Sequence, residues 1–431
     1  MSTAKRRIGV AADDITGAND VGVMFSKNGY RVKVMSLSAK PASADFDETD
    51  VLVINTSCRL CSAQEARRLT LEAVSFLKQM RCRLLYIKTC SVFRGNIGAM
   101  FDAAQDALCQ SATAVIAAYP ANGRTTERGV HLLNGVPVAN THFANDPVTP
   151  LKYSNLAELI GVQSPRRCEC FTYDMYGENE KKQLEALKQN AAYVIFDARD
   201  QQELRHAARL IADETLICGS SAVCEELPGV WGEADAALKY YPKHETGRGA
   251  VVLSGSLTPQ TALQVQYLIK HGIYAERLLS DRLFSESSRL AETQRVFEAC
   301  RAYTERGEAA LVYTSPDRDG ESAERRAAGL SDIDAGRCVS LAFRTLAEKF
   351  SREAGAERFV VAGGETSDAV SLGLGLREMR IYQEIEPGVP LMSAPGPRGE
   401  EYALVFKSGS FGSPEFLQHA LDAVCGRDEN S

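Results

Sequence analysis

The chain has 431 residues, enough for two to three domains with buried cores. It carries 49 basic and 56 acidic residues, a net charge of -7, and 45% of its residues are hydrophobic. A protein that coats nucleic acid needs a basic excess, and no apolar run reaches the roughly 18 residues of a membrane span. We therefore expect neither a nucleic acid nor a membrane as partner. The chain reaches Asp13 and Asp14 before an apolar signal core can form, which predicts a cytoplasmic protein.

The twelve cysteines of a chain this long, without a secretion signal, are expected to be reduced. Cys58 and Cys61 form one CxxC pair, and only Cys168 with Cys170 is similar. A zinc site needs a second pair or histidines at ligand spacing. The sequence therefore predicts buried or loop thiols rather than a zinc or redox centre. The six histidines show no metal-ligand or triad spacing and are expected to be structural or exposed.

Short β-branched runs alternate with segments of helical period, which predicts βαβ units around mainly parallel sheets. Ser62 with Glu65 and Asp200 with Glu203 are capping boxes that predict helix starts. Asn134-Gly135 predicts a hairpin turn between residues 130–133 and 136–138. Strands of the first half are predicted at residues 8–12, 32–35, 51–55, 84–88, 114–118 and 193–196.

At residues 236–249 the pattern lapses into Lys, Tyr, Pro, His and Gly, and a new strand begins at once. This predicts an N-terminal domain at residues 1–240 and a C-terminal domain at 248–431. Thr258-Pro259 predicts a helix start, and His271-Gly272 its end. The fold class expected is α/β, with two domains that each contain a mainly parallel or mixed sheet flanked by helices. Strands of the second half are predicted at residues 250–253, 311–313, 359–362, 381–384 and 402–406.

Three strand ends of the second half are rich in glycine and hydroxyl groups. They lie at residues 254–258, 363–367 and 407–412. Ligands of open α/β sheets bind at the carboxyl ends of strands, where glycine lets an anion approach the backbone and a helix N-terminus favours negative charge. One such loop can need Gly and Ser for its geometry alone, but three in one domain favour phosphate binding. Lys407 either neutralises a phosphate there or is solvated.

The strand ends of the first half carry charges instead. Asp13 and Asp14 follow the first strand, Arg59 follows the third and Lys88 closes the fourth, with Ser91, Arg94 and Asn96 next. Such cations suit a carboxylate substrate, and a carboxylate beside them can orient and deprotonate a hydroxyl. The alternative is that the aspartates cap a helix and the cations are solvated. Their convergence on one sheet edge favours a site.

Other motifs are either ambiguous or missing. The loop Gly123-Arg124-Thr125-Thr126 either touches a substrate or shapes the first domain. The sequence contains no Walker A loop, protein-kinase motif set, GxSxG or GxGxxG. The common nucleotide motifs therefore do not describe this chain.

These residues resemble the four-carbon acid sugar kinase family. The segment 12–20 is similar to that family's ADD-x-TGA-x-D opening, 88–96 to its lysine-to-RGN segment, and 123–126 to its GRTT loop. In the second half, 363–367, 386–390 and 407–412 resemble its GG-x-TS, PGVP and KSG-x-FG motifs. The matches keep their order over nearly the whole chain. Cys90 and Val92 stand where many members have polar residues, and Leu257 where many have cysteine, so the particular acid stays open.

The resemblance implies an ATP-dependent kinase that phosphorylates the terminal hydroxyl of threonate, erythronate or an oxo-tetronate, with Mg2+ on the ATP. It places the active site in the cleft between the two domains. Asp14 is the expected catalytic base, with Asp13 as its rival. The acid sugar is expected at Asp14, Arg59, Lys88, Thr89, Cys90, Ser91 and Arg94. ATP is expected at Ser254, Ser256, Gly363, Gly364, Glu365, Thr366, Ser367 and Gly409.

Two other classes remain open on the sequence. A non-catalytic sensor of a phosphorylated or acidic metabolite would explain the glycine loops and the cations, but not the Asp pair. A lyase would use Lys88 as a Schiff-base amine. The sequence also leaves a homo-oligomer open.

Overall fold

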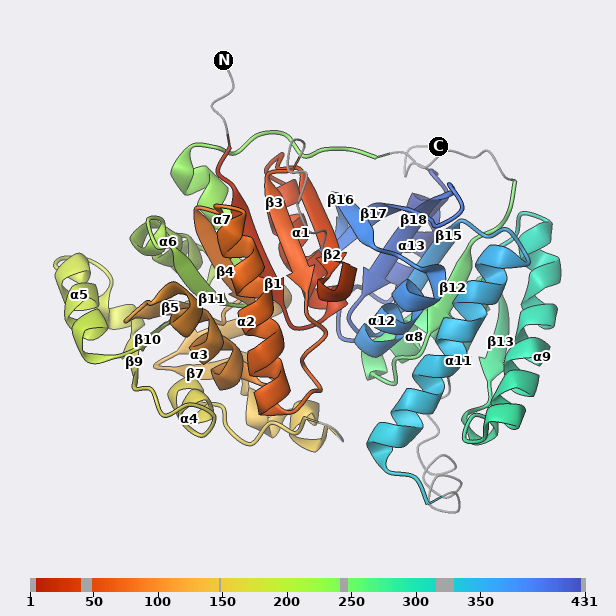
Figure 1. Cartoon of the computed structure of the whole chain (residues 1–431), viewed down its shortest axis with the longest axis horizontal. Coiled ribbons are helices and arrows are strands. Elements are labelled where there is room, and N and C mark those ends of the chain that lie inside the picture. The colour runs from red at the N-terminus through yellow and green to blue at the C-terminus, as the bar shows by residue number, and fades with distance from the viewer. Residues whose placement is uncertain (1–4, 40–48, 147–148, 241–246, 315–328, 428–431) are drawn as a thin grey trace. The chain divides into compact units, whose positions relative to one another are not determined.

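The computed structural model describes residues 5–39, 49–146, 149–240, 247–314 and 329–427. Two compact units divide the chain, Met1–Leu238 and Lys239–Ser431. Within the predicted boundary segment, residues 241–246 lie outside the described residues. Each unit is an α/β structure in which helices flank paired strands (Figure 1), as the sequence predicts.

The first unit contains a parallel sheet in the order β2-β3-β1-β4-β11-β5-β10-β9. The predicted strand at 114–118 is shifted, because β5 begins at Thr113 and ends at Ile116. Sequence analysis missed β9 and β11, because each strand has only four residues, too few to show an alternating hydrophobic pattern. The strands are β1 (Ile8–Ala12), β2 (Val32–Ser36), β3 (Val51–Asn55), β4 (Leu84–Lys88), β5 (Thr113–Ile116), β9 (Cys168–Phe171), β10 (Tyr193–Phe196) and β11 (Leu216–Gly219).

Helices cover both faces of this sheet. Ser62 and Asp200 cap α2 and α6 as predicted, each accepting a hydrogen bond from the backbone N–H three residues on. Helices α2, α3 and α4 share one core with the sheet, while α7 packs against α1 and α6. The helices are α1 (Ile15–Ser26), α2 (Ala63–Gln79), α3 (Ile97–Leu108), α4 (Leu156–Gly161), α5 (Glu180–Asn190), α6 (Gln201–Ile211) and α7 (Val223–Trp231).

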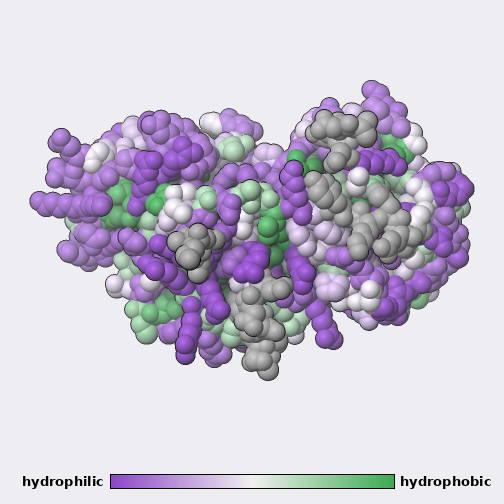
Figure 2. All heavy atoms as spheres, turned by 90° about the horizontal axis from the view of Figure 1, so that it is seen from above, coloured by the Kyte–Doolittle hydropathy of each residue, from purple (hydrophilic) through white to green (hydrophobic). Residues whose placement is uncertain are grey.

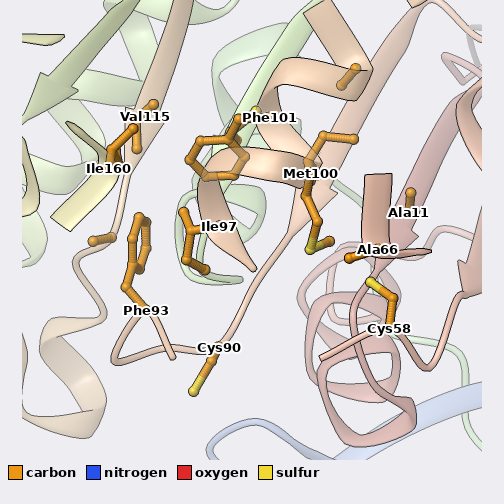
Figure 3. Close-up of a cluster of buried hydrophobic side chains, with 14 of the residues drawn as sticks. Ala11, Cys58, Ala66, Cys90, Phe93, Ile97, Met100, Phe101, Val115 and Ile160 are labelled. Carbon is orange, nitrogen blue, oxygen red and sulfur yellow. The ribbon is translucent and has the colours of Figure 1, made fainter. Parts of the chain in front are cut away.

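The core beneath α2 and α3 continues up to the loop after β4. Figure 3 shows Phe93, Ile97 and Phe101 in this cluster, with Cys90 on the same loop. Phe93 and Phe101 meet edge to face, with ring centroids 6.2 Å apart. Because Phe93 packs into this apolar core, the loop after β4 is held in place, and its polar residues stay at the carboxyl end of the strand.

The Asn134-Gly135 hairpin is confirmed. It joins β7 (Val130–Leu133) to β8 (Val136–Pro137), and β6 (Arg124–Glu127) completes a small antiparallel sheet. Both turn residues have positive φ, at 50° and 79°, as this type of two-residue turn requires.

The second unit contains a mixed sheet in the order β13-β14-β12-β15-β18-β17-β16. Only the β16-β17-β18 end is antiparallel. Sequence analysis missed β13 and β17, since β13 alternates weakly and β17 contains two prolines. The strands are β12 (Val251–Ser254), β13 (Tyr274–Leu278), β14 (Ala310–Thr314), β15 (Arg358–Ala362), β16 (Glu378–Glu386), β17 (Val389–Pro395) and β18 (Glu401–Lys407).

The helices of the second unit begin and end on local signals. Thr258 caps α8 by accepting from the Thr261 N–H, Pro259 is its first residue, and His271 follows its end, as predicted. Glycine residues precede and follow α12. The helices are α8 (Pro259–Lys270), α9 (Glu286–Glu305), α11 (Asp332–Arg352), α12 (Gly364–Leu374) and α13 (Phe416–Val424).

The surface matches the charged composition. Hydrophilic side chains dominate the face shown in Figure 2, and hydrophobic ones form small separate patches. Among the described helices, none is long and apolar enough to span a membrane.

We predict that Gly219 is required for the parallel sheet of the first unit. It ends β11 at a φ of 149°, and a Cβ there would overlap the carbonyl oxygen of Ile116. Gly219→Ala should therefore lower the free energy of unfolding by about 2 kcal/mol or more. Gly229→Ala is the control, because a Cβ at that position would meet nothing within 4 Å outside its own helix. Equal urea midpoints for the two variants would contradict this role.

Candidate active site

Two adjacent carboxylates stand where β1 ends. Asp14 caps α1: its Oδ1 accepts from the Gly17 N–H at 2.6 Å and its Oδ2 from the Thr16 hydroxyl at 2.9 Å. Asp13 and Asp14 are both buried. The helix-capping interpretation is therefore correct for Asp14, but it does not explain why Asp13 is buried beside it.

Arg59 explains the burial of both carboxylates. Its Nε and Nη2 donate to the two oxygens of Asp13 at 2.8 and 2.7 Å, and its Nη1 donates to Asp14. Burial opposes the charge of Asp14, but Arg59, Lys88, Gly17 N–H and Thr16 outweigh it and hold its pKa below the usual range. Asp14 is therefore an anion at neutral pH, ready to accept a hydrogen bond from a hydroxyl.

The loop after β4 holds Arg59 in place. Asn96 donates from Nδ2 to three carbonyl oxygens of the Arg59 loop, those of Cys58, Arg59 and Cys61, at 2.9 to 3.3 Å. Gly95 has a φ of 95°, and a Cβ there would stand 3.0 Å from the Arg59 Cγ. Gly95 and Asn96 of the RGN segment thus position Arg59.

Lys88 reaches the same region from β4. Its side chain is 2% exposed, and its Nζ lies 3.2 Å from Asp20 Oδ2. It also donates to the Thr89 carbonyl oxygen at 2.9 Å. Ser221 donates to the same Asp20 oxygen at 2.7 Å. Sequence analysis gave no role to Asp20 or Ser221, although Asp20 lies inside the opening motif.

The remaining predicted residues of this loop have different surroundings. Arg94 pairs with Asp146 and lies over the Phe143 ring, 4.9 Å from its centroid. Burial opposes the thiolate form of Cys90, but Arg94 and Arg59 outweigh it and lower its pKa. Thr89 donates from its hydroxyl to the Gly219 carbonyl oxygen at 3.3 Å, and Ser91 is buried. Arg94 and Cys90 therefore belong to one charged cluster with Asp13, Asp14, Arg59 and Lys88, whereas Thr89 is tied to the sheet.

His131 supports this loop and was missed as a site residue. Its Nε2 lies 2.9 Å from the Ser91 carbonyl oxygen, and its Nδ1 lies 3.1 Å from Thr126 Oγ1. Burial lowers the pKa of His131 to about 4, so the ring is neutral at pH 7. Only the folding of the hairpin against the β4 loop brings His131 there, and no local signal in the sequence indicates it.

Two loops of the second unit meet after β12 and β18. Thr258 and Thr261 both donate hydroxyl hydrogen bonds to the Gly409 carbonyl oxygen, at 2.6 and 2.9 Å. Ser256 Oγ lies 3.1 Å from Thr258 Oγ1. A Cβ on Gly409 would overlap Ser256 Oγ. Ser254 is buried at the end of β12.

The third loop brings the N-terminus of α12 to the same place. Gly363 has a φ of 119°, and a Cβ on it would lie 3.0 Å from Thr366 Oγ1 and 3.3 Å from the Ser256 nitrogen. No side chain caps the helix. The backbone N–H groups at its start, from Gly364, are therefore suited to an anion.

Two further predicted ATP residues lie in the first turn of α12. Ser367 donates its hydroxyl to the Gly363 carbonyl oxygen at 2.8 Å, inside its own helix. Glu365 is exposed. The meeting point of the three loops is thus formed by Ser256, Thr258, Gly363, Thr366 and Gly409.

All twelve cysteines are free, and burial raises the pKa of the Cys58 thiol to about 12. Over the described ranges, no three His, Cys, Asp or Glu side chains are grouped to hold a metal ion.

Comparisons with known proteins match this division of the chain. Residues 8–227 match the family model described as a sugar-binding N-terminal domain, and residues 251–417 match a nucleotide-binding C-terminal domain. The chain is 31% identical over 427 residues to a 3-oxo-tetronate kinase of Pectobacterium atrosepticum, covering 96% of this chain and 98% of the relative. The chain belongs to the four-carbon acid sugar kinase family. Its resemblance to that family is confirmed.

Two further proteins are similar to this chain over nearly its whole length. A D-threonate kinase of Salmonella typhimurium is 30% identical, covering 97% of this chain and 99% of the relative. A solved structure from Salmonella typhimurium LT2 has a TM-score of 0.80 at 29% identity, covering 96% of this chain and 98% of that one. Relatives in this acid sugar kinase family are thus curated kinases of more than one four-carbon acid.

We predict that His131 makes the protein less stable in mild acid. The unfolded chain protonates this residue near its ordinary pKa of 6.5, while the folded chain keeps it neutral down to about pH 4. Stability is therefore lost as pH falls from 6.5 to 4, by about 2 kcal/mol at pH 5. Urea unfolding at pH 7.5 and 5 should show this extra loss in the wild type and the exposed-site variant His271→Gln, but not in His131→Gln. The same pH dependence in all three proteins would contradict it.

Proposed function

We propose that this chain transfers the γ-phosphate of ATP to the terminal hydroxyl of a four-carbon acid sugar. The observation that carries the proposal is the convergence of three glycine-containing strand ends on an uncapped helix N-terminus, in the unit that matches the nucleotide-binding family model. Backbone N–H groups and a helix dipole stabilise phosphate. The charged cluster of the other unit supplies the cations and carboxylates for the acid sugar.

Arg59 and Lys88 are proposed to receive the sugar carboxylate. A guanidinium has five N–H donors, and Asp13 and Asp14 use three of those of Arg59. The other two can bind the substrate carboxylate while the pairing with Asp13 keeps the guanidinium in a fixed plane. The proposed sugar contacts are completed by four residues of the loop after β4, namely Thr89, Cys90, Ser91 and Arg94.

Asp14 is proposed to orient and deprotonate the acceptor hydroxyl. Phosphoryl transfer depends mainly on positioning and on neutralising charge, so a carboxylate that stays ionised is suited to hold the hydroxyl in line. Asp13 is the rival, but both of its oxygens already accept hydrogen bonds from Arg59. The acid sugar and Asp14 must approach the γ-phosphate closely for transfer.

ATP is proposed to bind at Ser254, Ser256, Gly363, Gly364, Glu365, Thr366, Ser367 and Gly409. Mg2+ would come with the nucleotide and would neutralise charge on the transferred phosphate. A protein cage of ligands is not required for this role.

We predict ADP release that depends on one acid. The purified chain should be assayed with ATP and Mg2+ across 3-oxo-tetronate, 2-oxo-tetronate and both enantiomers of threonate and erythronate. Relatives named for 3-oxo-tetronate and D-threonate make these two the first candidates. Binding of an acid without ADP release would favour a sensor. A borohydride-trapped adduct on Lys88 would favour a lyase.

Asp14→Asn should lower kcat by at least ~100-fold with the preferred acid. Asparagine is also a good helix N-cap, so the variant keeps the cap of α1 and isolates the charge. Thr16→Ser is the control, since its hydroxyl can still donate to Asp14. Near-normal turnover of folded Asp14→Asn would transfer the role to Asp13.

Gly409→Ala should raise the KM for ATP by roughly tenfold or more and leave the KM for the acid within about twofold, because its Cβ would collide with the side chains of Ser256 and Thr258. Gly412→Ala is less suitable as a control, since its Cβ would meet Phe416. Gly229→Ala serves instead, because Gly229 is not among the glycines with a positive φ and a Cβ there would meet nothing within 4 Å outside its own helix. Equal effects on both KM values would contradict the assignment of this loop to ATP.

A further inference from the structure

Lys407 is a buried lysine at the meeting point of the nucleotide loops. It is the last residue of β18, level with Ala362 at the end of β15. Its side chain is 0% exposed. The alternative that this lysine is solvated at a strand end is therefore wrong.

Neutral oxygen atoms surround its amine. Nζ donates to Thr261 Oγ1 at 2.9 Å and to the Gly409 carbonyl oxygen at 3.3 Å. Within the part of the chain that the structure describes, no carboxylate lies within 4.0 Å of this Nζ. An ammonium group has three N–H donors, so the two acceptors leave one for a ligand.

A comparison with Lys88 shows that Lys407 lacks a carboxylate partner among the described residues. Both lysines are buried at strand ends, but Lys88 has the Asp20 carboxylate at 3.2 Å. A buried ammonium without a counter-ion is costly, and the amine responds by losing its proton. Burial lowers the pKa of Lys407 to about 7, and Glu386 opposes this only from a distance.

Other groups packed around Lys407 do not replace a counter-ion. From α8, Thr261 and Gln264 face this region, and both are neutral. Glu386 at the end of β16 binds the Ser413 N–H and hydroxyl and His419 on α13. Glu386 is thus the charged group that acts on Lys407, but its carboxylate oxygens accept hydrogen bonds from Ser413 and contact His419 instead.

The positive ends of two helices also point to an anion. Thr258, the cap of α8, and Thr261 in its first turn bind the same Gly409 carbonyl as Lys407. The uncapped start of α12 adjoins Ser256 in the same group of loops. Helix N-termini raise the local potential, which further disfavours a second positive charge until an anion arrives.

We propose that Lys407 takes up one proton from solvent when a nucleotide phosphate binds to these loops. The lone pair of the neutral Nζ binds the proton, and the resulting ammonium donates its remaining N–H to a phosphate oxygen. Lys407 is thereby a nucleotide-binding residue whose charge appears only in the complex. This inference rests on the proposed nucleotide site of the second unit.

Such a site makes nucleotide affinity depend on pH. Below about pH 7 the lysine is already protonated, so little proton uptake accompanies binding. Above it, binding must recruit the proton, and Kd rises by up to roughly tenfold per pH unit. Between pH 7 and 9 a terminal phosphate with a pKa near ~6 is already ionised and contributes little.

The test is calorimetric titration of the full chain with ADP and Mg2+ at pH 8, in two buffers that differ in ionisation enthalpy. The wild type should take up close to one proton per ADP, and its Kd should rise from pH 7 to 9. Lys407→Met should bind ADP at least about tenfold more weakly at pH 7, with no net uptake and a flat pH dependence. Lys270→Met, an exposed lysine on α8, should behave as the wild type.

The outcomes separate the two proposals. Wild-type chain that fails to bind ADP at any pH would overturn the proposed nucleotide site. Binding by the wild type without proton uptake, or uptake that persists in folded Lys407→Met, would overturn the role of Lys407 alone. If Lys407→Met does not fold, Lys407→Arg takes its place: an arginine stays protonated at these pH values, so its proton uptake should vanish, and uptake that persists would overturn the role of Lys407.

Discussion

The burial of charge at the carboxyl ends of parallel strands is the constraint on which this structure depends. Asp13 and Asp14 are buried because the guanidinium of Arg59 binds both of them. A single carboxylate buried without this partner would be protonated or would destabilise the fold. The features around Arg59 serve to keep it there: Asn96 ties down its loop, and Gly95 lets the two loops approach.

The two units meet the same constraint in different ways. In the first, Lys88 is paired with Asp20, and Arg59 is paired with Asp13 and Asp14, so each of these cations has a carboxylate beside it. In the second, hydroxyls, glycine backbone and helix N-termini gather around Lys407 without a carboxylate beside it. A cluster that contains both cations and carboxylates suits a substrate that carries both a carboxylate and hydroxyls. An electropositive region built from neutral groups suits the phosphates of a nucleotide.

Local signals predicted much of the fold. Strand β1 and helices α2 and α8 are as expected because a buried run, a serine or threonine cap and an N-terminal proline act over a few residues. Strands β9, β11 and β13 were missed, since each is short or only partly buried and gains its stability from neighbours across the sheet.

The sequence by itself determined the α/β class, the family and the residues at the strand ends, because these depend on local period, caps and ordered motifs. Only the tertiary structure decided what those residues contact. It paired Arg59 with both aspartates, placed His131 under the Ser91 loop and buried Lys407 among neutral oxygens. These contacts join residues up to 146 positions apart, as for Lys407 and Thr261, and no local pattern encodes such a distance. Burial and charge compensation depend on all neighbours of a group at once, so they follow from packing alone.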